Sequence, residues 1–254
     1  MIEPIERTKT GIYGLDELLE GGFPKRRTIL VTGSTGTGKS ILGMQFLYRG
    51  IVESEEPGVF VTFDEMPDKI RQDMLKFGWN LKELEDNNLL GLVDVTSARA
   101  GAPSDEPRAL LPGQLDFDKM LVDILAIARN IGAKRLVIDS IPAMIFHMGN
   151  EAELRRALLK LSYVVARSGM TTLMTTEIPE QPIGGGGALH FSRYGVEEYI
   201  SDGVLLLSFL GVGAQATRTL YVRKMRGTKH SMEIHPMEIT DKGIVVRKIE
   251  EVFK

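Results

Sequence analysis

The sequence contains no cysteine, which excludes disulfide bridges, thiolate metal sites and cysteine nucleophiles. Histidine is also scarce, because the chain has only His147, His190, His230 and His235. His230 and His235 are an odd number of positions apart, so on a strand they would lie on opposite faces. With no cysteine pair beside them, we expect no structural zinc site. Neither sign of charge dominates, since 31 basic and 34 acidic residues give a net charge of −3. A slightly acidic chain is not typical of a dedicated DNA-coating protein.

Long apolar runs are absent too, and none approaches the roughly 20 residues that a membrane-spanning helix needs. Residues 1–7 lack the basic-then-apolar pattern of a secretion signal, so we expect a cytoplasmic protein that does not enter the membrane. The chain has 254 residues, of which 43% are hydrophobic and 26% charged, as is typical of a globular protein. No long linker or internal repeat divides it. We therefore expect a single domain over residues 1–254.

The most informative motif is a glycine-rich stretch, residues 33–40, which fits the pattern G-x-x-x-x-G-K-[ST]. An apolar β-rich run, 28–32, precedes it and a helical run, 41–48, follows it. Glycines and a helix N-terminus can surround phosphate oxygens with backbone N–H groups. The lysine would reach the β- and γ-phosphates of ATP, and the last hydroxyl would hold Mg²⁺. The predicted nucleotide-binding residues are Gly33, Ser34, Thr35, Gly36, Thr37, Gly38, Lys39 and Ser40.

Strand-like and helical patterns alternate up to about residue 178 and then stop alternating. The first strand-like runs are 28–32, 59–63, 89–95, 135–139 and 170–176. The later ones, which have no helices between them, are 204–210, 217–224, 232–239 and 244–247. This order predicts an α/β fold with a mainly parallel, helix-covered sheet and antiparallel C-terminal strands. Residues 97–113 are predicted to be a long polar loop, and such loops tend to be functional or mobile.

Acidic side chains follow three of these runs, where a parallel sheet places its ligand-facing residues. Asp139 can order Mg²⁺ through water. Asp64 and Glu65 can orient or deprotonate an attacking water, and we expect Glu65 to be the base while Asp64 assists. Thr176 and Glu177 end another strand, where they either sense the γ-phosphate or simply cap the strand.

Two cations stand together near the C-terminus. Alternation along a strand predicts that Lys224 and Arg226 share one face and that Met225 lies on the other. Such a pair can stabilise charge on a transferring phosphoryl group. The alternative is an edge strand that its charges protect from aggregation.

Together these residues resemble the KaiC-like branch of the RecA-type P-loop ATPases, over nearly the whole chain. The matching segments are residues 10–18, 33–40, 61–65, 137–140, 175–177, 193–198, 224–230 and 239–244. The resemblance implies a RecA-like fold that binds ATP between the subunits of a ring, which the family suggests is hexameric. In such proteins the pair matching Asp64 and Glu65 is catalytic and usually Glu-Glu, so the first member here is one methylene shorter. The residues matching Lys224 and Arg226 serve the neighbour's nucleotide.

The resemblance does not extend to a clock function. KaiC itself has two such domains and its autophosphorylation belongs to the second, whereas this sequence has one and no assignable phosphorylation site. We therefore expect a homo-oligomeric ATPase that binds ATP or ADP with Mg²⁺ and acts as a signalling or assembly switch.

Two alternatives remain open at this point. One is a RecA-like or RadA-like ATPase that binds single-stranded DNA. The loop at Gly184–Gly187 has few basic residues, but Arg193 with Phe191 and Tyr194 could stack on bases. The other is a nucleotide-gated scaffold that hydrolyses little ATP.

Overall fold

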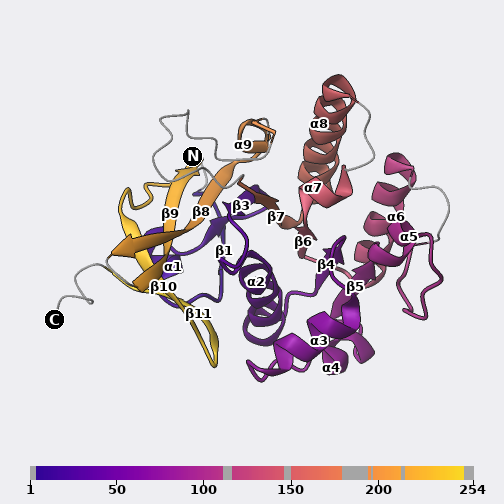
Figure 1. Ribbon diagram of the computed structural model, residues 1–254, viewed down its shortest axis with the longest axis horizontal. Coiled ribbons are helices and arrows are strands. Elements are labelled where there is room, and N and C mark those ends of the chain that lie inside the picture. Colours follow the sequence, from indigo (N-terminus) through magenta and orange to yellow (C-terminus); the bar gives the residue numbers. More distant parts are fainter. Residues whose placement is uncertain are drawn as a thin grey trace.

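The computed structural model describes residues 4–110, 116–145, 150–178, 194–195, 197–212 and 215–248. Within these ranges nine strands form one sheet in the order β11-β10-β9-β8-β3-β7-β6-β4-β5 (Figure 1). Two short strands, β1 (Arg7–Thr8) and β2 (Phe23–Pro24), pair with each other outside it. The observed sheet confirms the predicted α/β class.

The centre of the sheet consists of parallel strands filled with buried residues, as a sheet covered on both faces requires. In spatial order these are β8 (Gly203–Val212), β3 (Thr28–Gly33), β7 (Thr171–Glu177), β6 (Arg135–Asp139), β4 (Gly58–Thr62) and β5 (Leu90–Asp94). They all run in the same direction. Their carboxyl ends therefore meet at one edge, the carboxyl edge, and their amino ends at the opposite amino edge.

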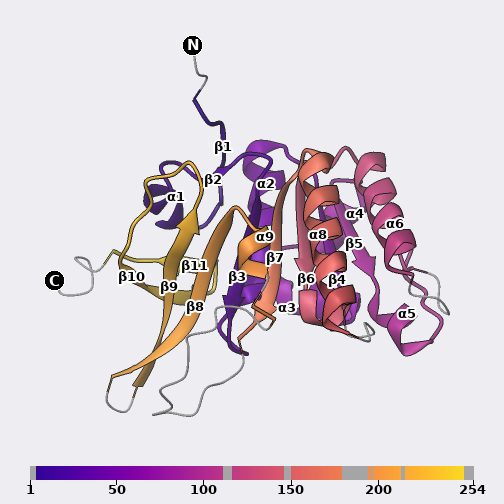
Figure 2. The same ribbon diagram turned by 90° about the horizontal axis from the view of Figure 1, so that it is seen from above.

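Helices cover both faces of the parallel strands (Figures 1 and 2). One face carries α2 (Lys39–Ser54), α3 (Pro67–Leu75) and α4 (Leu81–Asp86), and the other carries α6 (Phe117–Asn130) and α8 (Glu151–Ser168). Alternation along β3 supplies both cores, because Ile29 and Val31 join one buried cluster and Leu30 joins the other. The side chains of Asp116 and Asn150 accept backbone N–H bonds at the starts of α6 and α8, which explains where these helices begin.

The remaining strands extend the sheet in antiparallel order, as predicted. They are β9 (Gln215–Met225), β10 (Ile234–Thr240) and β11 (Gly243–Val246). Strand β8 joins the two parts, because it pairs in parallel with β3 and antiparallel with β9. Consequently β9 runs back across the sheet, from the carboxyl edge to the amino edge.

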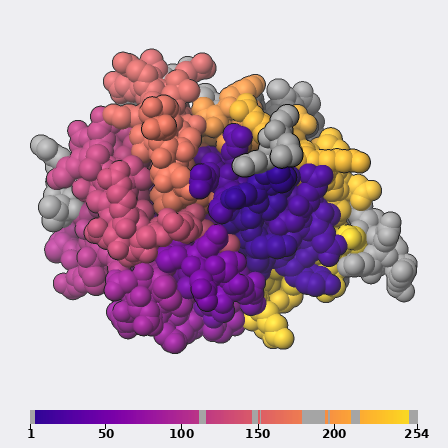
Figure 3. Space-filling model, turned by 180° about the vertical axis from the view of Figure 1, so that it is seen from behind, coloured from indigo at the N-terminus to yellow at the C-terminus, as the bar shows by residue number. Residues whose placement is uncertain are grey.

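The N-terminal segment packs against the antiparallel extension. Helix α1 (Leu15–Leu18) buries both its terminal leucines, and Val246 N donates to Tyr13 O at 2.9 Å. Figure 3 shows the indigo N-terminal atoms beside the yellow C-terminal strands. Gly14 has a φ of 81°, and a Cβ there would lie 2.0 Å from Val246 O, so this contact requires glycine.

A buried arginine connects α2 to the amino edge. The side chain of Arg135 is 1% exposed and forms an ion pair with Glu56 at 2.7 Å. It also donates to the carbonyls of Lys9 and Phe46, and its guanidinium lies 4.5 Å from the centre of the Phe46 ring. Burial lowers the pKa of Arg135 and the bond to Glu56 opposes that shift. This charge is therefore tolerated because its neighbours satisfy it.

Three features of the local structure were not predicted from the sequence. The predicted loop at 97–113 begins with a helix, α5 (Thr96–Ala100), because the Asp94 carboxylate accepts the Ser97 backbone N–H. Two further four-residue helices, α7 (Ile141–Met144) and α9 (Glu197–Ile200), are too short for a periodic pattern to reveal.

The third feature is the placement of the two neighbouring histidines. His235 lies in β10, but His230 precedes that strand. The reason is a local turn, in which the Ser231 hydroxyl bonds to His235 Nε2 at 2.8 Å and accepts the Glu233 N–H.

Candidate functional site

A cavity of about 380 Å³ opens at the carboxyl edge, within the usual size of small-ligand pockets, about 300–1,000 Å³. Segments far apart in the sequence line it. The lining residues are Thr35, Gly36, Gly38, Lys39, Ser40, Ile41, Thr62, Asp64, Glu65, Asp139, Ser140, Glu177, Arg218 and Ile239. Hollows of about 440 and 540 Å³ lie elsewhere, and neither includes a residue of 33–40, the phosphate loop.

The phosphate loop connects β3 to α2 through a backbone that needs glycine. Gly36 and Gly38 have φ values of 79° and 103°, which other residues rarely adopt. At Gly33, a Cβ would lie 2.3 Å from the carbonyl oxygen of Leu207 on β8. Helix α2 begins at Lys39, and no side chain caps its N-terminus. Its first backbone N–H groups are therefore available to an anionic ligand.

Lys39 lies over this loop. Its Nζ donates to the carbonyls of Gly33 and Ser34 at 2.9 and 3.0 Å. Burial lowers the pKa of Lys39, while the charges of Glu177 and Asp139 oppose that shift. Because its hydrogen-bond partners are neutral carbonyls, the ammonium keeps a charge that can attract a phosphate.

Asp139 lies where the sequence predicted, at the end of β6 and facing the phosphate loop. Burial raises the pKa of Asp139, and hydrogen bonds from Thr175 and Ser40 oppose that shift. The Thr175 hydroxyl donates to its Oδ1. The bond to Ser40 places the Asp139 carboxylate beside the first turn of α2. From there it can order a cation next to phosphate oxygens.

Asp64 and Glu65 follow β4 and line the same cavity, but their side chains differ in their surroundings. Asp64 accepts bonds from Arg99 at 3.1 Å and from the Ser140 hydroxyl at 2.9 Å. Glu65 has its backbone fixed by Thr62, whose hydroxyl donates to Glu65 O at 2.6 Å. Burial raises the pKa of Glu65, with smaller contributions from nearby carboxylates.

The side chains of Thr176 and Glu177, at the end of β7, have different surroundings. Glu177 lines the cavity, and the Thr35 hydroxyl contacts its Oε1 at 3.5 Å. Thr176 is fully buried and donates to Glu197 Oε1 at 3.2 Å. Among the described residues, Glu177 is therefore the one of this pair that a ligand in the cavity could contact.

Arg218 and Ile239 line the cavity, although neither was among the candidate site residues predicted from the sequence. Arg218 Nε donates to Gly36 O at 3.3 Å, and its guanidinium lies 5.3 Å from the centre of the Phe209 ring. Ile239 packs close to Gly38, because a Cβ on Gly38 would lie 3.2 Å from Ile239 Cδ1. Strand register decides both placements, and the sequence does not specify it. The spacing of Arg218 and Lys224 could have indicated this placement. Residues six positions apart on a strand are separated by about 20 Å, so these two cations must lie near opposite edges of the sheet.

Lys224 and Arg226 lie at the amino edge, away from the phosphate loop of their own chain. Met225 pairs with Gly203, and Gly203 pairs with Ile29 at the start of β3. Lys224 Nζ donates to the carbonyls of Glu198 and Ser201 at 3.1 and 2.6 Å, and burial lowers the pKa of Lys224. Arg226 is 61% exposed and stands 3.7 Å from Asp202. Met225 is buried, as strand alternation predicted.

Some predicted features fall outside the described residues. These are the loop Gly184–Gly187, Phe191, Arg193, His147 and His190. Among the residues that are described, no three histidine, aspartate or glutamate side chains form a cluster that could hold a metal ion by themselves. None of the helices in this part of the chain is long and apolar enough to span a membrane.

Comparison with known proteins agrees with this geometry. The family model "ATPase: KaiC" matches residues 8–251. A UPF0273 protein of Pyrococcus furiosus is 37% identical over 242 residues, covering 95% of this chain and 94% of that protein. The circadian clock oscillator protein KaiC of Parathermosynechococcus lividus is 38% identical over 94% of this chain, which spans 42% of its length.

A solved structure has the same fold. The crystal structure of a KaiC-like protein from Pyrococcus horikoshii superimposes with a TM-score of 0.82 and 40% sequence identity. The match covers 96% of this chain and 100% of that one. The phosphate loop at the carboxyl edge, the family match and these relatives lead to one conclusion: the chain belongs to the KaiC family of ATPases.

Proposed function

We propose that this chain is a Mg²⁺-dependent ATPase of one domain that works in a homo-oligomeric ring, with ATP between neighbouring subunits. One observation carries the proposal. The phosphate loop, Asp139 and the Asp64–Glu65 pair line a single cavity, whereas Lys224 and Arg226 lie at the opposite edge of the sheet. One subunit would supply the binding and acidic groups, and the next would supply the two cations.

The cavity fits a nucleoside triphosphate as substrate. The phosphates would rest on the loop N–H groups and Lys39, with Arg218 of the same chain close to Gly36. Ile41 and Ile239 provide apolar surface on the lining for the nucleobase. A negatively charged triphosphate also compensates the buried charge of Lys39.

The donor set fits Mg²⁺ as well. This ion prefers oxygen ligands, and in phosphate sites it uses few protein groups beside the substrate's own oxygens. The Ser40 hydroxyl would bind it directly and Asp139 would orient its water ligands. When bound, Mg²⁺ would neutralise charge on the phosphate oxygens.

Glu65 would accept a proton from the attacking water. A raised pKa makes its carboxylate a stronger proton acceptor than an ordinary glutamate. The neighbouring subunit would place Arg226, and with it Lys224, near the oxygens that gain charge during transfer. Cations at that position stabilise the transition state without any covalent chemistry.

Such a site implies head-to-tail assembly. A contact between one amino edge and the next carboxyl edge joins two different surfaces, so repetition produces a ring or a filament. The KaiC-like resemblance favours a closed ring of six. Because nucleotide would bind between subunits, it would stabilise the ring by mass action. We infer that this coupling serves a signalling or assembly switch rather than metabolism.

Mixing two inactive variants tests the proposal. Arg226→Ala should bind ATP on its own phosphate loop but hydrolyse it poorly, and Glu65→Gln should behave likewise. After subunit exchange, some interfaces combine an intact Glu65 with an intact Arg226, so activity should partly return. Lys82→Ala, an exposed change on α4, is the control variant.

Two results would contradict the proposal. One is a lack of recovery after exchange has been verified by mass spectrometry of labelled subunits. The other is a stable monomer that hydrolyses ATP at the full rate. Strong stimulation of turnover by single-stranded DNA would instead favour the DNA-binding alternative.

A further inference from the structure

Arg99 connects α5 to the acidic pair at the end of β4. Its Nη1 donates to the carbonyl of Phe63 and, at 3.1 Å, to Asp64 Oδ1. The other oxygen of Asp64 accepts the Ser140 hydroxyl at 2.9 Å. Both carboxylate oxygens of Asp64 are therefore bonded to donors from two different elements. The Arg99 side chain is only 22% exposed, although Asp64 itself is 60% exposed.

Glu65 shows the opposite arrangement. Its backbone is fixed, because its carbonyl accepts the Thr62 hydroxyl at 2.6 Å and the Thr96 hydroxyl of α5 at 3.3 Å. Its backbone N–H donates to the same Thr62 hydroxyl. Among the described residues, by contrast, no hydrogen bond or ion pair reaches its carboxylate. Helix α5 thus holds the main chain of Glu65 and the side chain of Asp64, and leaves the Glu65 carboxylate free.

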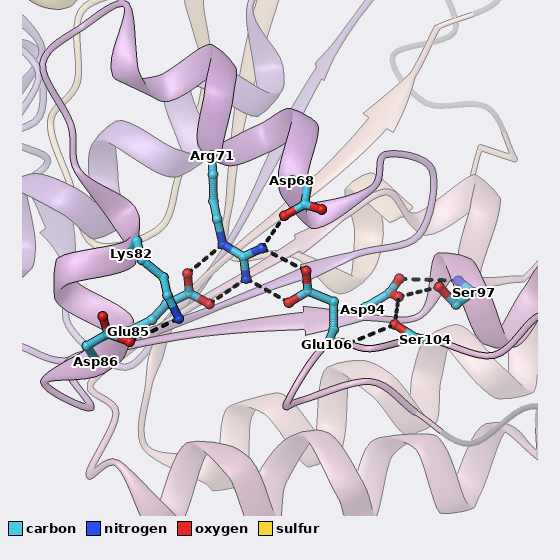
Figure 4. Close-up of polar contacts among 9 residues, drawn as sticks. All are labelled: Asp68, Arg71, Lys82, Glu85, Asp86, Asp94, Ser97, Ser104 and Glu106. Atoms are coloured by element: carbon cyan, nitrogen blue, oxygen red, sulfur yellow. Dashed lines mark hydrogen bonds and ion pairs between the residues drawn. The ribbon is translucent and has the colours of Figure 1, made fainter.

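The segment that carries Arg99 is itself firmly anchored (Figure 4). Asp94, at the end of β5, accepts hydrogen bonds from the hydroxyls of Ser97 and Ser104. Further along, Glu106 binds Arg71 of α3 through two bonds of 2.7 Å each. Because α3 begins two residues after Glu65, both ends of the segment 96–106 are fixed relative to the acidic pair.

Arg71 makes this anchor stronger than a surface contact. Its guanidinium also binds Glu85 through two bonds, of 2.8 and 3.0 Å, and the side chains of Glu85 and Glu106 are 6% and 15% exposed. Paired, partly buried Arg–carboxylate forks of this kind have a defined geometry. Arg99 is therefore presented to Asp64 from a rigid support and not from a mobile loop.

From this geometry we infer that Arg99 is a positioning residue for the proposed hydrolysis: it holds Asp64 in a fixed, charge-compensated state, so that Glu65 alone accepts the proton from water. The inference rests on the proposed function and deepens it, because it assigns different roles to two adjacent carboxylates. Donors from Arg99 and Ser140 already occupy the two carboxylate oxygens of Asp64, whereas the Glu65 carboxylate is available to a water molecule in the cavity.

A double-mutant cycle tests the inference. We would measure kcat and nucleotide Kd for the wild type, Arg99→Met, Asp64→Asn and the combined variant. Arg99→Met should lower kcat about tenfold to a hundredfold, the range expected when a hydrogen bond to a charged group is lost. Nucleotide Kd should stay unchanged, and Arg99→Lys should restore part of kcat. In the Asp64→Asn background, Arg99→Met should have little further effect, because the partner is already gone.

Arg108→Met is the matched control. Arg108 lies two residues beyond the segment 96–106 and donates to Asn88 at 3.0 Å, away from the acidic pair. Its loss should leave kcat unchanged. Arg99→Met also removes the bond to the Phe63 carbonyl, so unfolding curves must accompany the kinetics. Asp64→Asn keeps that carbonyl bond and stays informative if Arg99→Met folds poorly.

Each remaining outcome has a distinct meaning. Independent, multiplicative effects of the two changes on kcat would overturn the coupling between Arg99 and Asp64. A larger loss of kcat in Asp64→Asn than in Glu65→Gln would overturn the division of roles. A wild-type protein that binds ATP without turnover would contradict the proposed hydrolysis itself, whereas full-rate Arg99→Met beside an active wild type would overturn only the role of Arg99.

Discussion

The carboxyl and amino edges of the sheet both carry cations, but the two sets are held in different ways. At the carboxyl edge Lys39 is bonded to carbonyls of the phosphate loop and shares its cavity with the carboxylates of Asp64, Glu65, Asp139 and Glu177. At the amino edge Lys224 is bonded to carbonyls around α9, and Arg226 extends into solvent. The first edge is a cavity with opposite charges in place. At the second edge, neither Lys224 nor Arg226 lines the cavity that contains the phosphate loop.

The two edges therefore differ in the part of the proposed reaction that each could serve. The groups that we propose to bind a triphosphate line one cavity of a single chain. In the proposed function, the charge of transfer is stabilised by cations from a neighbouring chain, and the amino edge holds Lys224 near the end of β9 and Arg226 directly after it. Head-to-tail contact between the two edges would therefore complete what each lacks.

The largest effect is expected for the base at the carboxyl edge. Glu65→Gln removes the proton acceptor but keeps the shape of the side chain, so hydrolysis should slow by about 10²–10⁴-fold. Nucleotide affinity should remain, because Gln cannot disturb the phosphate loop. Steady-state turnover and calorimetric titration measure the two properties. Wild-type turnover in both Glu65→Gln and Asp64→Asn would remove the pair from the mechanism.

A smaller effect, on binding, is expected for the cation at the same edge. Lys39→Ala removes the lysine of the phosphate loop and should weaken ATP binding by roughly 10–10³-fold, as the loss of one or two charge-assisted bonds predicts. Weaker ATP binding stabilises the fold less, so the rise in Tm at a given ATP concentration should become smaller. Lys82→Ala serves as the control. An unchanged Kd in Lys39→Ala would refute the assignment of the loop.

At the amino edge the two cations should differ in their effect on stability. Lys224→Ala removes two bonds to backbone carbonyls and should lower the free energy of unfolding by about 1–2 kcal/mol. Arg226→Ala removes an exposed side chain and should change it by about 0.5 kcal/mol or less. Chemical denaturation without nucleotide, at one protein concentration, compares them. Equal destabilisation would mean that Arg226 is structural and not free to serve a neighbour.

The same contrast shows what the sequence could and could not predict. Every strand of the main sheet followed from apolar periodicity, and the phosphate loop followed from glycines in a strand–helix context. Both are local patterns. Asp139 and Glu65 were predictable because parallel strands bring their carboxyl ends together, which is a rule of the fold and not of one sequence.

The sequence did not predict the residue placements that depend on strand register or on side-chain hydrogen bonds. Arg218 reaches the phosphate loop because β8 and β9 pair over ten residue positions, and no local pattern specifies that alignment. The backbone acceptors of Lys224 were not predicted, because one is Glu198 O in the four-residue helix α9 and the other is Ser201 O directly after it. The segment after β5 was expected to be a loop, although the Arg71 and Asp94 contacts fix it.

The smallest and most discriminating prediction is the pH dependence of turnover, which probes both edges in one experiment. Burial raises the pKa of Glu65, so this base becomes protonated at a higher pH than an ordinary glutamate at 4.5, and turnover should fall on the acid side. Burial and the nearby charge of Arg226 lower the pKa of Lys224, so this cation loses its charge below its ordinary value of 10.5, and turnover should fall on the alkaline side. The result is a bell-shaped profile.

Single variants assign the two limbs. The residual turnover of Glu65→Gln should lose the acid limb, and Lys224→Arg should move the alkaline limb out of range, because an arginine stays charged. Asp139 and Lys39 also have shifted pKa values, but they act on nucleotide binding, so Kd is measured at each pH to separate them. An alkaline limb that persists in Lys224→Arg while Kd stays constant would show that the amino edge takes no part in transfer, and the two-edge site would then be wrong.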